Sequence, residues 1–151
     1  MHKDWKFSHV CMVVRDMDKA INHYEALGVG PFPPMIGGPE GMPLTERTVR
    51  GEPSDYDMDL RIVREGMGGM GLELIQPLKG RSIYDEFLEE KGEGAHHVCY
   101  NVEDLDKEIA DMAKAGFKVI QTGGIAGVKW AYFDTDEDGG IIIELGQRLS
   151  Q

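Results

Sequence analysis

Hydrophobic and polar residues alternate in two stretches of this chain that share one pattern and lie 88 positions apart. In residues 7–14 the alternation predicts a strand, with His9 and Cys11 on the same face because side chains two positions apart point the same way. His97 and Cys99 occupy the matching positions of the second stretch. Each stretch therefore predicts a strand that carries a histidine.

The repeat continues without a gap through a predicted helix in each copy. Asp16 and Asp104 stand where a helix N-cap is expected, and an acidic residue suits the positive end of the helix dipole. Apolar residues then recur at helical spacing until Gly28 and Gly116, which are expected to end the two helices. The sequence therefore predicts two copies of one structural unit.

Each copy goes on with apolar or alternating runs that predict strands. In the first copy these runs follow the Gly- and Pro-rich stretch 30–53, which we expect to be irregular. A helix is expected to link the copies. The predicted strands are 57–63, 72–76, 117–121, 128–134 and 141–145, with turns at 66–71, 123–124 and 136–140 and the linking helix at 82–91. Each copy thus reads strand, helix, strand, strand, strand.

The amino-acid composition limits the kinds of molecule that this protein is expected to bind. The 151 residues suffice for one domain, and 41% of them are apolar. The net charge of −11 disfavours binding to nucleic acid or to anionic membranes. Two cysteines do not make a disulfide scaffold, and the first residues lack the apolar core of a signal peptide. We therefore expect a cytoplasmic protein with reduced thiols and a small-molecule substrate.

The last predicted strand of each copy places a glutamate, Glu73 or Glu144, among aliphatic residues. A single glutamate of this kind usually lies on the wet face of a sheet. Because the copies match, a pseudo-twofold axis would bring both glutamates together with His9 and His97. Two imidazoles and two carboxylates suit a divalent ion such as Zn, Co, Ni, Mn or Fe. The alternative, two histidines hydrogen-bonded in the core, would also bury two glutamate charges without compensation.

Three segments carry a resemblance to a known family: residues 72–78, 94–102 and 139–147. They resemble the vicinal-oxygen-chelate superfamily of glyoxalases, bleomycin resistance proteins and dioxygenases, and within it the methylmalonyl-CoA epimerases. The resemblance implies an α+β fold in which two paired βαβββ units form a cupped mixed β-sheet with helices on the outside. Unit 1 would span about 6–78, the linker helix about 82–91 and unit 2 about 94–147, within one domain of residues 1–151. The implied metal ligands are His9, Glu73, His97 and Glu144.

The resemblance also implies a chemistry, namely a metal-dependent epimerase or isomerase that moves an α-proton beside a thioester carbonyl. Methylmalonyl-CoA is the first candidate substrate. By the same match Glu144 is both a metal ligand and a catalytic base. The second base of the family is a glutamate ahead of the second strand, and the sequence departs from the pattern there. The acidic residues nearest that place are, in order of preference, Asp57, Asp55, Glu46 and Glu52.

Other functions of the superfamily remain as alternatives. A glyoxalase I-type lactoylglutathione lyase uses similar ligands, and other members act on other small substrates. A ring-cleaving dioxygenase would hold iron with three protein ligands rather than four, and a drug-binding protein of the bleomycin-resistance type would lack the ligand set. The resemblance further implies a homodimer that acts on an acyl-CoA or another thioester.

Overall fold

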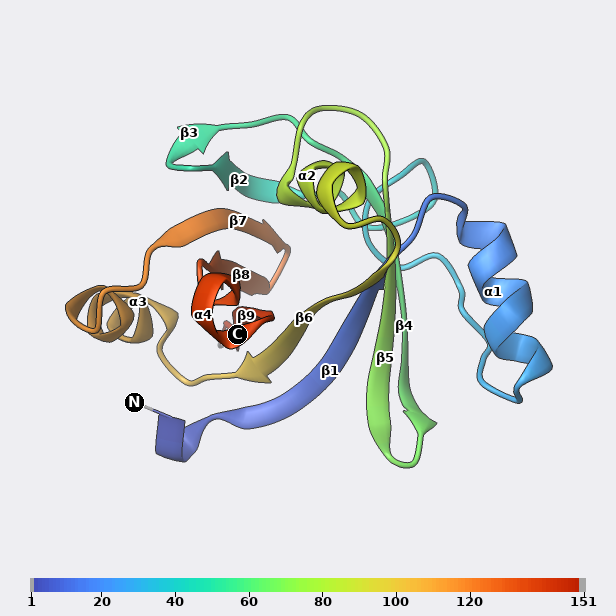
Figure 1. Ribbon diagram of the computed structural model, residues 1–151, viewed down its shortest axis with the longest axis horizontal. Helices are drawn as coiled ribbons and strands as arrows, with labels where there is room; N and C mark the ends of the chain where they lie inside the picture. Colours follow the sequence, from blue (N-terminus) through green and yellow to red (C-terminus); the bar gives the residue numbers. More distant parts are fainter. Residues whose placement is uncertain (1, 150–151) are drawn as a thin grey trace.

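The computed structural model describes residues 2–149, which form one mixed β-sheet curled into a cup (Figure 1). Helices α1 and α3 lie at opposite outer sides of the cup, and the chain begins with a short 3-10 helix, His2–Asp4. The strands are β1 (Lys6–Val13), β2 (Thr45–Val49), β3 (Glu52–Pro53), β4 (Met58–Met67), β5 (Met70–Pro77), β6 (Gly94–Asn101), β7 (Val119–Ile125), β8 (Val128–Phe133) and β9 (Ile142–Arg148). The helices are α1 (Met17–Ala26), α2 (Ile83–Glu90), α3 (Leu105–Lys114) and α4 (Asp136–Gly139). The predicted α+β class with a cupped mixed sheet is confirmed.

The first strands of the two units, β1 and β6, pair antiparallel and so join the two units in the sheet. β5 lies parallel to β1 on one side, and β9 lies parallel to β6 on the other. The whole strand order is β3-β2-β7-β8-β9-β6-β1-β5-β4. β5 and β9 therefore flank the β1–β6 pair symmetrically, as the sequence repeat predicts.

The predicted helix ends are confirmed in both units. The side chains of Asp16 and Asp104 each accept a hydrogen bond from the backbone N–H three residues on, at 3.1 and 3.0 Å. Gly28 and Gly116 follow the last turns with φ of 83° and 92°. Because side chains with a Cβ rarely adopt that backbone conformation, glycine suits both helix stops.

The stretch 30–53 was expected to be irregular, but it contains β2 and β3. β2 belongs to the first unit and yet pairs antiparallel with β7 of the second unit. Farther back along the same stretch, Ile36 exchanges two backbone hydrogen bonds with Leu60 of the edge strand β4, at 3.2 and 3.0 Å. This stretch thus connects the two ends of the sheet, which a local sequence pattern does not reveal.

Two further expectations are wrong in detail. Residues 136–140 were expected to be a turn, but residues 136–139 form the short helix α4. Residues 123–124 were also expected to be a turn, whereas β7 continues through them as far as Ile125. The remaining predicted strands and helices are present, with ends that differ by a few residues.

The packing around Gly123 explains why strand β7 continues through residues that were expected to form a turn. A Cβ at this position would lie 2.7 Å from the Tyr56 hydroxyl oxygen and 2.8 Å from the Trp130 ring. The Tyr56 hydroxyl donates a hydrogen bond of 2.8 Å to the carbonyl oxygen of Thr122. The glycine is therefore required by close packing between β7 and the buried aromatic core, and it is not a turn residue.

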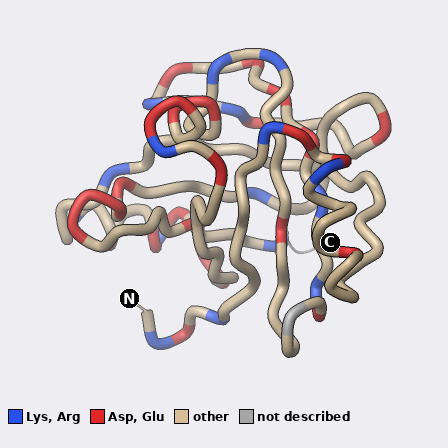
Figure 2. The backbone as a smooth tube through the Cα atoms, turned by 45° about the vertical axis from the view of Figure 1, so that its right-hand side comes forward, with Lys and Arg blue, Asp and Glu red and all other residues tan. Residues whose placement is uncertain are grey.

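Acidic residues are spread over loops, helices and strands along the whole chain (Figure 2). Within residues 2–149, no helix has the length and apolar composition needed to cross a membrane. The buried core under the sheet is rich in aromatic residues, including Tyr84 and Tyr132, whose hydroxyl oxygens lie 2.6 Å apart.

We expect the substitution Gly123→Ala to lower the free energy of unfolding by about 1–3 kcal/mol, because the added methyl group overpacks the contact with Tyr56 and Trp130. Urea unfolding monitored by tryptophan fluorescence measures the change. Gly139→Ala is the matched control, since nothing lies within 4 Å of its Cβ position. Equal stability of both variants would contradict this account of β7.

Candidate metal centre

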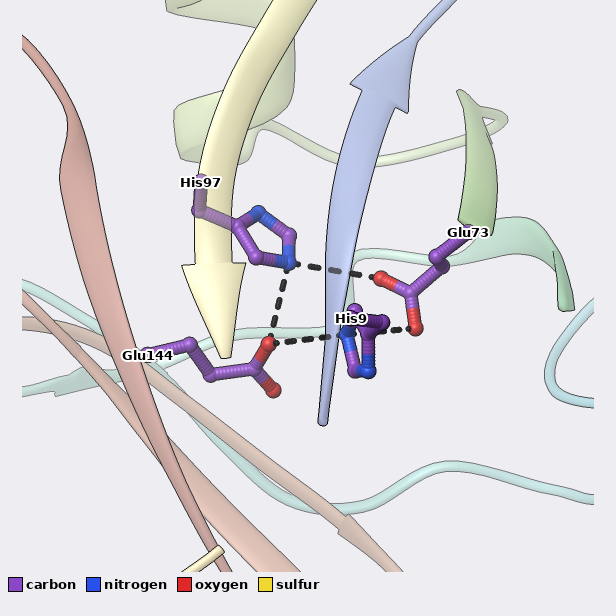
Figure 3. A group of neighbouring side chains, drawn as sticks. All are labelled: His9, Glu73, His97 and Glu144. Atoms are coloured by element: carbon purple, nitrogen blue, oxygen red, sulfur yellow. Dashed lines mark ion pairs between the residues drawn. The ribbon is translucent and has the colours of Figure 1, made fainter. Parts of the chain in front are cut away.

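Four polar side chains meet at the middle of the sheet (Figure 3). His9 comes from β1, His97 from β6, Glu73 from β5 and Glu144 from β9. One nitrogen or oxygen atom of each lies within 4.8 Å of the other three. The structure therefore brings together the four residues that the sequence singled out as ligands.

Strand register accounts for this convergence. β5 runs beside β1 with Glu73 opposite Cys11, and β9 runs beside β6 with Glu144 opposite Cys99. Each cysteine lies two positions after the histidine of its own strand, so histidine, cysteine and neighbouring glutamate share one face. The parallel pairing of each unit thus delivers one histidine and one glutamate to the same place.

Each histidine contacts both carboxylates. The Nε2 atom of His9 lies 3.1 Å from an oxygen of Glu73 and 3.5 Å from an oxygen of Glu144. The Nε2 atom of His97 lies 3.3 Å from Glu73 and 2.9 Å from Glu144. All four side chains are buried. The arrangement is a closed ring of alternating imidazoles and carboxylates.

The pKa values of the ring follow from this geometry. Burial by itself lowers the pKa of His9, but the charges of Glu73 and Glu144 outweigh it and raise that pKa to about 10. Burial likewise opposes a charge on His97, and Glu144 raises its pKa. Burial would raise the carboxyl pKa values of Glu73 and Glu144, but His9 and His97 respectively hold them below their usual range. Without a metal, these contacts thus favour ionised carboxylates beside protonated imidazoles.

The ring also leaves polar atoms unsatisfied. His9 Nε2, His97 Nε2, Glu73 Oε1 and Glu144 Oε2 are buried and make no hydrogen bond of normal geometry with any residue of the range 2–149. Their contacts with the other charged atoms of the ring are not aligned as hydrogen bonds. Burying polar atoms without hydrogen bonds is costly. Two nitrogen and two oxygen donors aimed at one point fit a divalent first-row metal ion.

Sequence reasoning missed two residues at this centre. The Oγ atom of Ser8 lies 2.9 Å from Nδ1 of His9. The Nδ1 atom of His96 lies 2.7 Å from Nδ1 of His97. The signal that could have revealed them is the repeat itself, because each candidate ligand histidine is preceded by a hydrogen-bonding side chain.

A cavity of about 90 Å³ opens onto the ring. His9, Glu73 and Glu144 form part of its surface, apolar side chains including Trp130 form half of the remaining lining residues, and two arginines also contribute. The aliphatic and arginine residues are Met35, Ile36, Leu60, Ile62, Ile125, Val128, Arg64 and Arg148. Both arginines are exposed. The ring is thus accessible to a small molecule with an apolar part.

None of the four acidic residues considered as a second base lines this cavity in the described part of the chain. Asp57 is half-buried and accepts backbone hydrogen bonds from Gly38 and Met58, at 3.1 and 2.9 Å. The other three, Asp55, Glu46 and Glu52, are exposed. The structure therefore does not bring these carboxylates to the ring, and their role as a base stays a prediction.

This chain has relatives among known proteins. A bovine relative, the mitochondrial methylmalonyl-CoA epimerase of Bos taurus, is 26% identical over 147 residues, which cover 94% of this chain and 74% of that protein. The ethylmalonyl-CoA/methylmalonyl-CoA epimerase of Cereibacter sphaeroides is 26% identical over 148 residues, covering 94% of this chain and 97% of that protein.

Solved structures share the fold. The methylmalonyl-CoA epimerase of Mycobacterium tuberculosis superposes with a TM-score of 0.62 at 22% identity, covering 96% of this chain and 89% of that one. The family model described as the glyoxalase/bleomycin resistance protein/dioxygenase superfamily matches residues 8–132. The match runs from β1 into β8, so it takes in His9, Glu73 and His97 but ends before β9 and Glu144. This chain belongs to the glyoxalase/bleomycin resistance protein/dioxygenase superfamily.

Proposed function

We propose that this protein is a metal-dependent epimerase that moves the α-proton of an acyl thioester, with methylmalonyl-CoA as the first candidate substrate. The observation that carries the proposal is the ring of His9, His97, Glu73 and Glu144 at the base of a mostly apolar cavity. The relatives named as methylmalonyl-CoA epimerases support the same chemistry.

His9, Glu73, His97 and Glu144 would hold one divalent ion, either Co, Zn, Ni, Mn or Fe. When bound, the ion would stabilise the negative charge that develops on the thioester oxygen as the α-proton leaves. The four residues are fixed by strands of the central sheet, so the charge-stabilising group would be in place before the substrate arrives. Such preorganisation lowers the barrier because little has to rearrange during the reaction.

Epimerisation needs a proton acceptor on one face of the α-carbon and a proton donor on the other. In the described chain Glu144 and Glu73 are the only Asp or Glu side chains that line the cavity. They come from strands on opposite sides of the β1–β6 pair. We therefore assign Glu144 as one proton carrier, and geometry favours Glu73 over Asp57 or Asp55 as the other.

The surface of the cavity sets the kind of substrate. Its aliphatic side chains suit a short acyl group, and burying each methylene of such a group contributes about 0.8 kcal/mol. Arg64 and Arg148, at the cavity surface, add positive charge in a protein whose net charge is −11. An acyl group that also carries a carboxylate or phosphate would fit this combination.

A second candidate is a lyase of the glyoxalase I type, acting on a glutathione hemithioacetal. Among the described residues, the only acids that line the cavity are the two proposed metal ligands. This favours the lyase, because that reaction moves a proton between neighbouring carbons and can be served by a single base. The same ring of ligands would serve both reactions, so the substrate distinguishes them.

The first prediction concerns the metal. His97→Ala removes a fully buried nitrogen ligand. We therefore expect the variant protein to lose most of its bound metal after purification and dialysis. The fold should survive, because β1, β5, β6 and β9 remain paired through their backbones. Elemental analysis gives the metal content, and circular dichroism gives the fold. Full occupancy in the double variant His9→Ala, His97→Ala would disprove the assignment.

The second prediction concerns protons. Below the pKa of His9 in the folded protein, about 10, the imidazole carries a proton that a metal must displace. The affinity for Co²⁺ should therefore rise with pH between 6.5 and 8. We expect a rise of about 10- to 100-fold per pH unit, for one to two protons released. Calorimetry in buffers of different ionisation enthalpy counts the protons. An affinity that does not change with pH would contradict the charged ring.

The third prediction concerns the reaction. With one enantiomer of methylmalonyl-CoA in D₂O, NMR should show deuterium entering the α-position while the other enantiomer accumulates. Glu144→Gln should slow both processes by about 10²- to 10⁴-fold, the usual contribution of a general acid or base. Glu73→Gln also removes a proposed metal ligand, so the metal content of this variant is measured first. In the metal-loaded variant, epimerisation should slow while exchange on the face served by Glu144 continues.

Asp57→Asn and Asp55→Asn separate the two assignments of the second base. If Glu73 is that base, both variants epimerise normally, and Asp57→Asn loses only stability through its hydrogen bonds to Gly38 and Met58. Loss of epimerisation in Asp57→Asn with unchanged metal content would restore Asp57 to that role. A metal-loaded wild type that ignores acyl-CoA but isomerises the hemithioacetal would replace the epimerase by the lyase.

A further inference from the structure

Each histidine of the ring is contacted at its Nδ1 atom, away from the carboxylates, by the residue that precedes it in the chain. The contact joins Ser8 Oγ to His9 Nδ1 at 2.9 Å, and His96 Nδ1 to His97 Nδ1 at 2.7 Å. Ser8 and His96 occupy the same position of the sequence repeat, 88 residues apart. Two chemically different side chains therefore make the same contact in the two units.

Neighbouring residues of a regular strand point to opposite faces, so this contact needs an explanation. The β1–β6 ladder is irregular at these two places. Between Phe7 and His9 the register skips Ser8, and between Cys11 and Met12 it skips His96 on the partner strand. Each of the two residues is thus the extra residue of a β-bulge. A bulge turns a side chain away from its regular direction, and here it turns the side chain toward the ring nitrogen of the next residue.

The contact determines where the imidazole proton lies. The Nε2 atoms of His9 and His97 face the carboxylates at the centre of the ring. A metal bound there would need the lone pair of Nε2, which leaves the proton on Nδ1. The Nδ1–H of His9 can then donate to the Ser8 hydroxyl. At 2.7 Å only one of the two facing imidazole nitrogens can carry a hydrogen, so with a metal on Nε2 His97 would donate and His96 would accept.

We propose that Ser8 and His96 are positioning residues, placed by paired β-bulges, that hold His9 and His97 with Nδ1 protonated and Nε2 directed at the metal. Partners of this kind fix the ring orientation and make the ligand nitrogen more basic. This inference rests on the proposed metal centre for its role, but the two hydrogen bonds can be tested without any metal.

The two positioning residues have different surroundings. Ser8 is half-buried and lines the cavity, so its hydroxyl is also within reach of a bound molecule. His96 is 2% exposed and enclosed by aromatic rings, with centroids 5.0 Å away for Phe87 and 5.4 Å away for Tyr84. His97 is therefore held by a rigid, enclosed partner, and His9 by a small hydroxyl at the cavity.

Matched pairs of variants test the proposal. His96→Asn keeps an acceptor close to the place of the imidazole Nδ1, whereas His96→Leu removes it at similar size. Ser8→Thr keeps the hydroxyl, and Ser8→Ala removes it. Co²⁺ affinity is measured by titrating the visible absorption of the cobalt protein. Ring Nδ1–H signals of His9 and His97 are followed by ¹H–¹⁵N NMR, in metal-free and Zn²⁺-loaded protein.

We expect His96→Leu and Ser8→Ala to weaken Co²⁺ binding by about 10- to 100-fold, the usual effect of removing such a partner. His96→Asn and Ser8→Thr should retain most of the affinity. The Nδ1–H signal of His97 should persist in His96→Asn and disappear in His96→Leu. Equal losses of affinity in the leucine and asparagine variants, with the signal unchanged in both, would overturn the proposal in favour of a packing role.

Two outcomes separate this proposal from the proposed function. If the wild type binds no metal, the metal centre fails, but the metal-free Nδ1–H signals and their loss in the two variants still decide the positioning role. If metal and epimerase activity are present and all four variants match the wild type, the positioning role fails alone. Should His96→Leu not fold, Ser8→Ala tests the same contact at a half-buried site.

Discussion

Two carboxylates buried side by side constrain the rest of this structure. Glu73 and Glu144 have oxygen atoms within 4.8 Å of each other. At that distance two unit charges repel by roughly 3 kcal/mol with an effective dielectric constant of about 20. Each carboxylate is compensated by contacts with both His9 and His97. The sheet can keep both acids ionised only while two cationic imidazoles, or a metal ion, stand between them.

This compensation requires the two histidines and the two glutamates to be placed accurately. The pairing of the two units supplies that placement. The four residues come from four adjacent strands, and the paired bulges at Ser8 and His96 adjust the ladder where the histidines sit. Backbone hydrogen bonds between the strands do not depend on the ring. The ring can therefore be less stable than the fold that carries it, which suits a site that has to exchange protons or accept an ion.

The sequence predicted the symmetric part of the molecule because the repeat records it. The sequence alone identified the four ring residues His9, His97, Glu73 and Glu144. Residues at equivalent positions of two repeated units are expected at equivalent positions of the paired units in the fold. The β2–β7 pairing and the path through Gly123 were not predicted, because each depends on a contact between distant segments. The contacts of Ser8 and His96 were also missed, since a bulge breaks the alternation on which strand predictions rest.

The asymmetric part of the chain has a different role. The stretch 30–53 has no counterpart of equal length in the second unit, and it reaches from the edge strand β4 to β7 across the open side of the sheet. Two of its residues, Met35 and Ile36, form part of the cavity surface above the ring. The symmetric strands thus place the four polar side chains, while this one stretch shapes part of the space beside them. Residues of the stretch 30–53 can therefore change the shape of the cavity while the four polar residues stay the same.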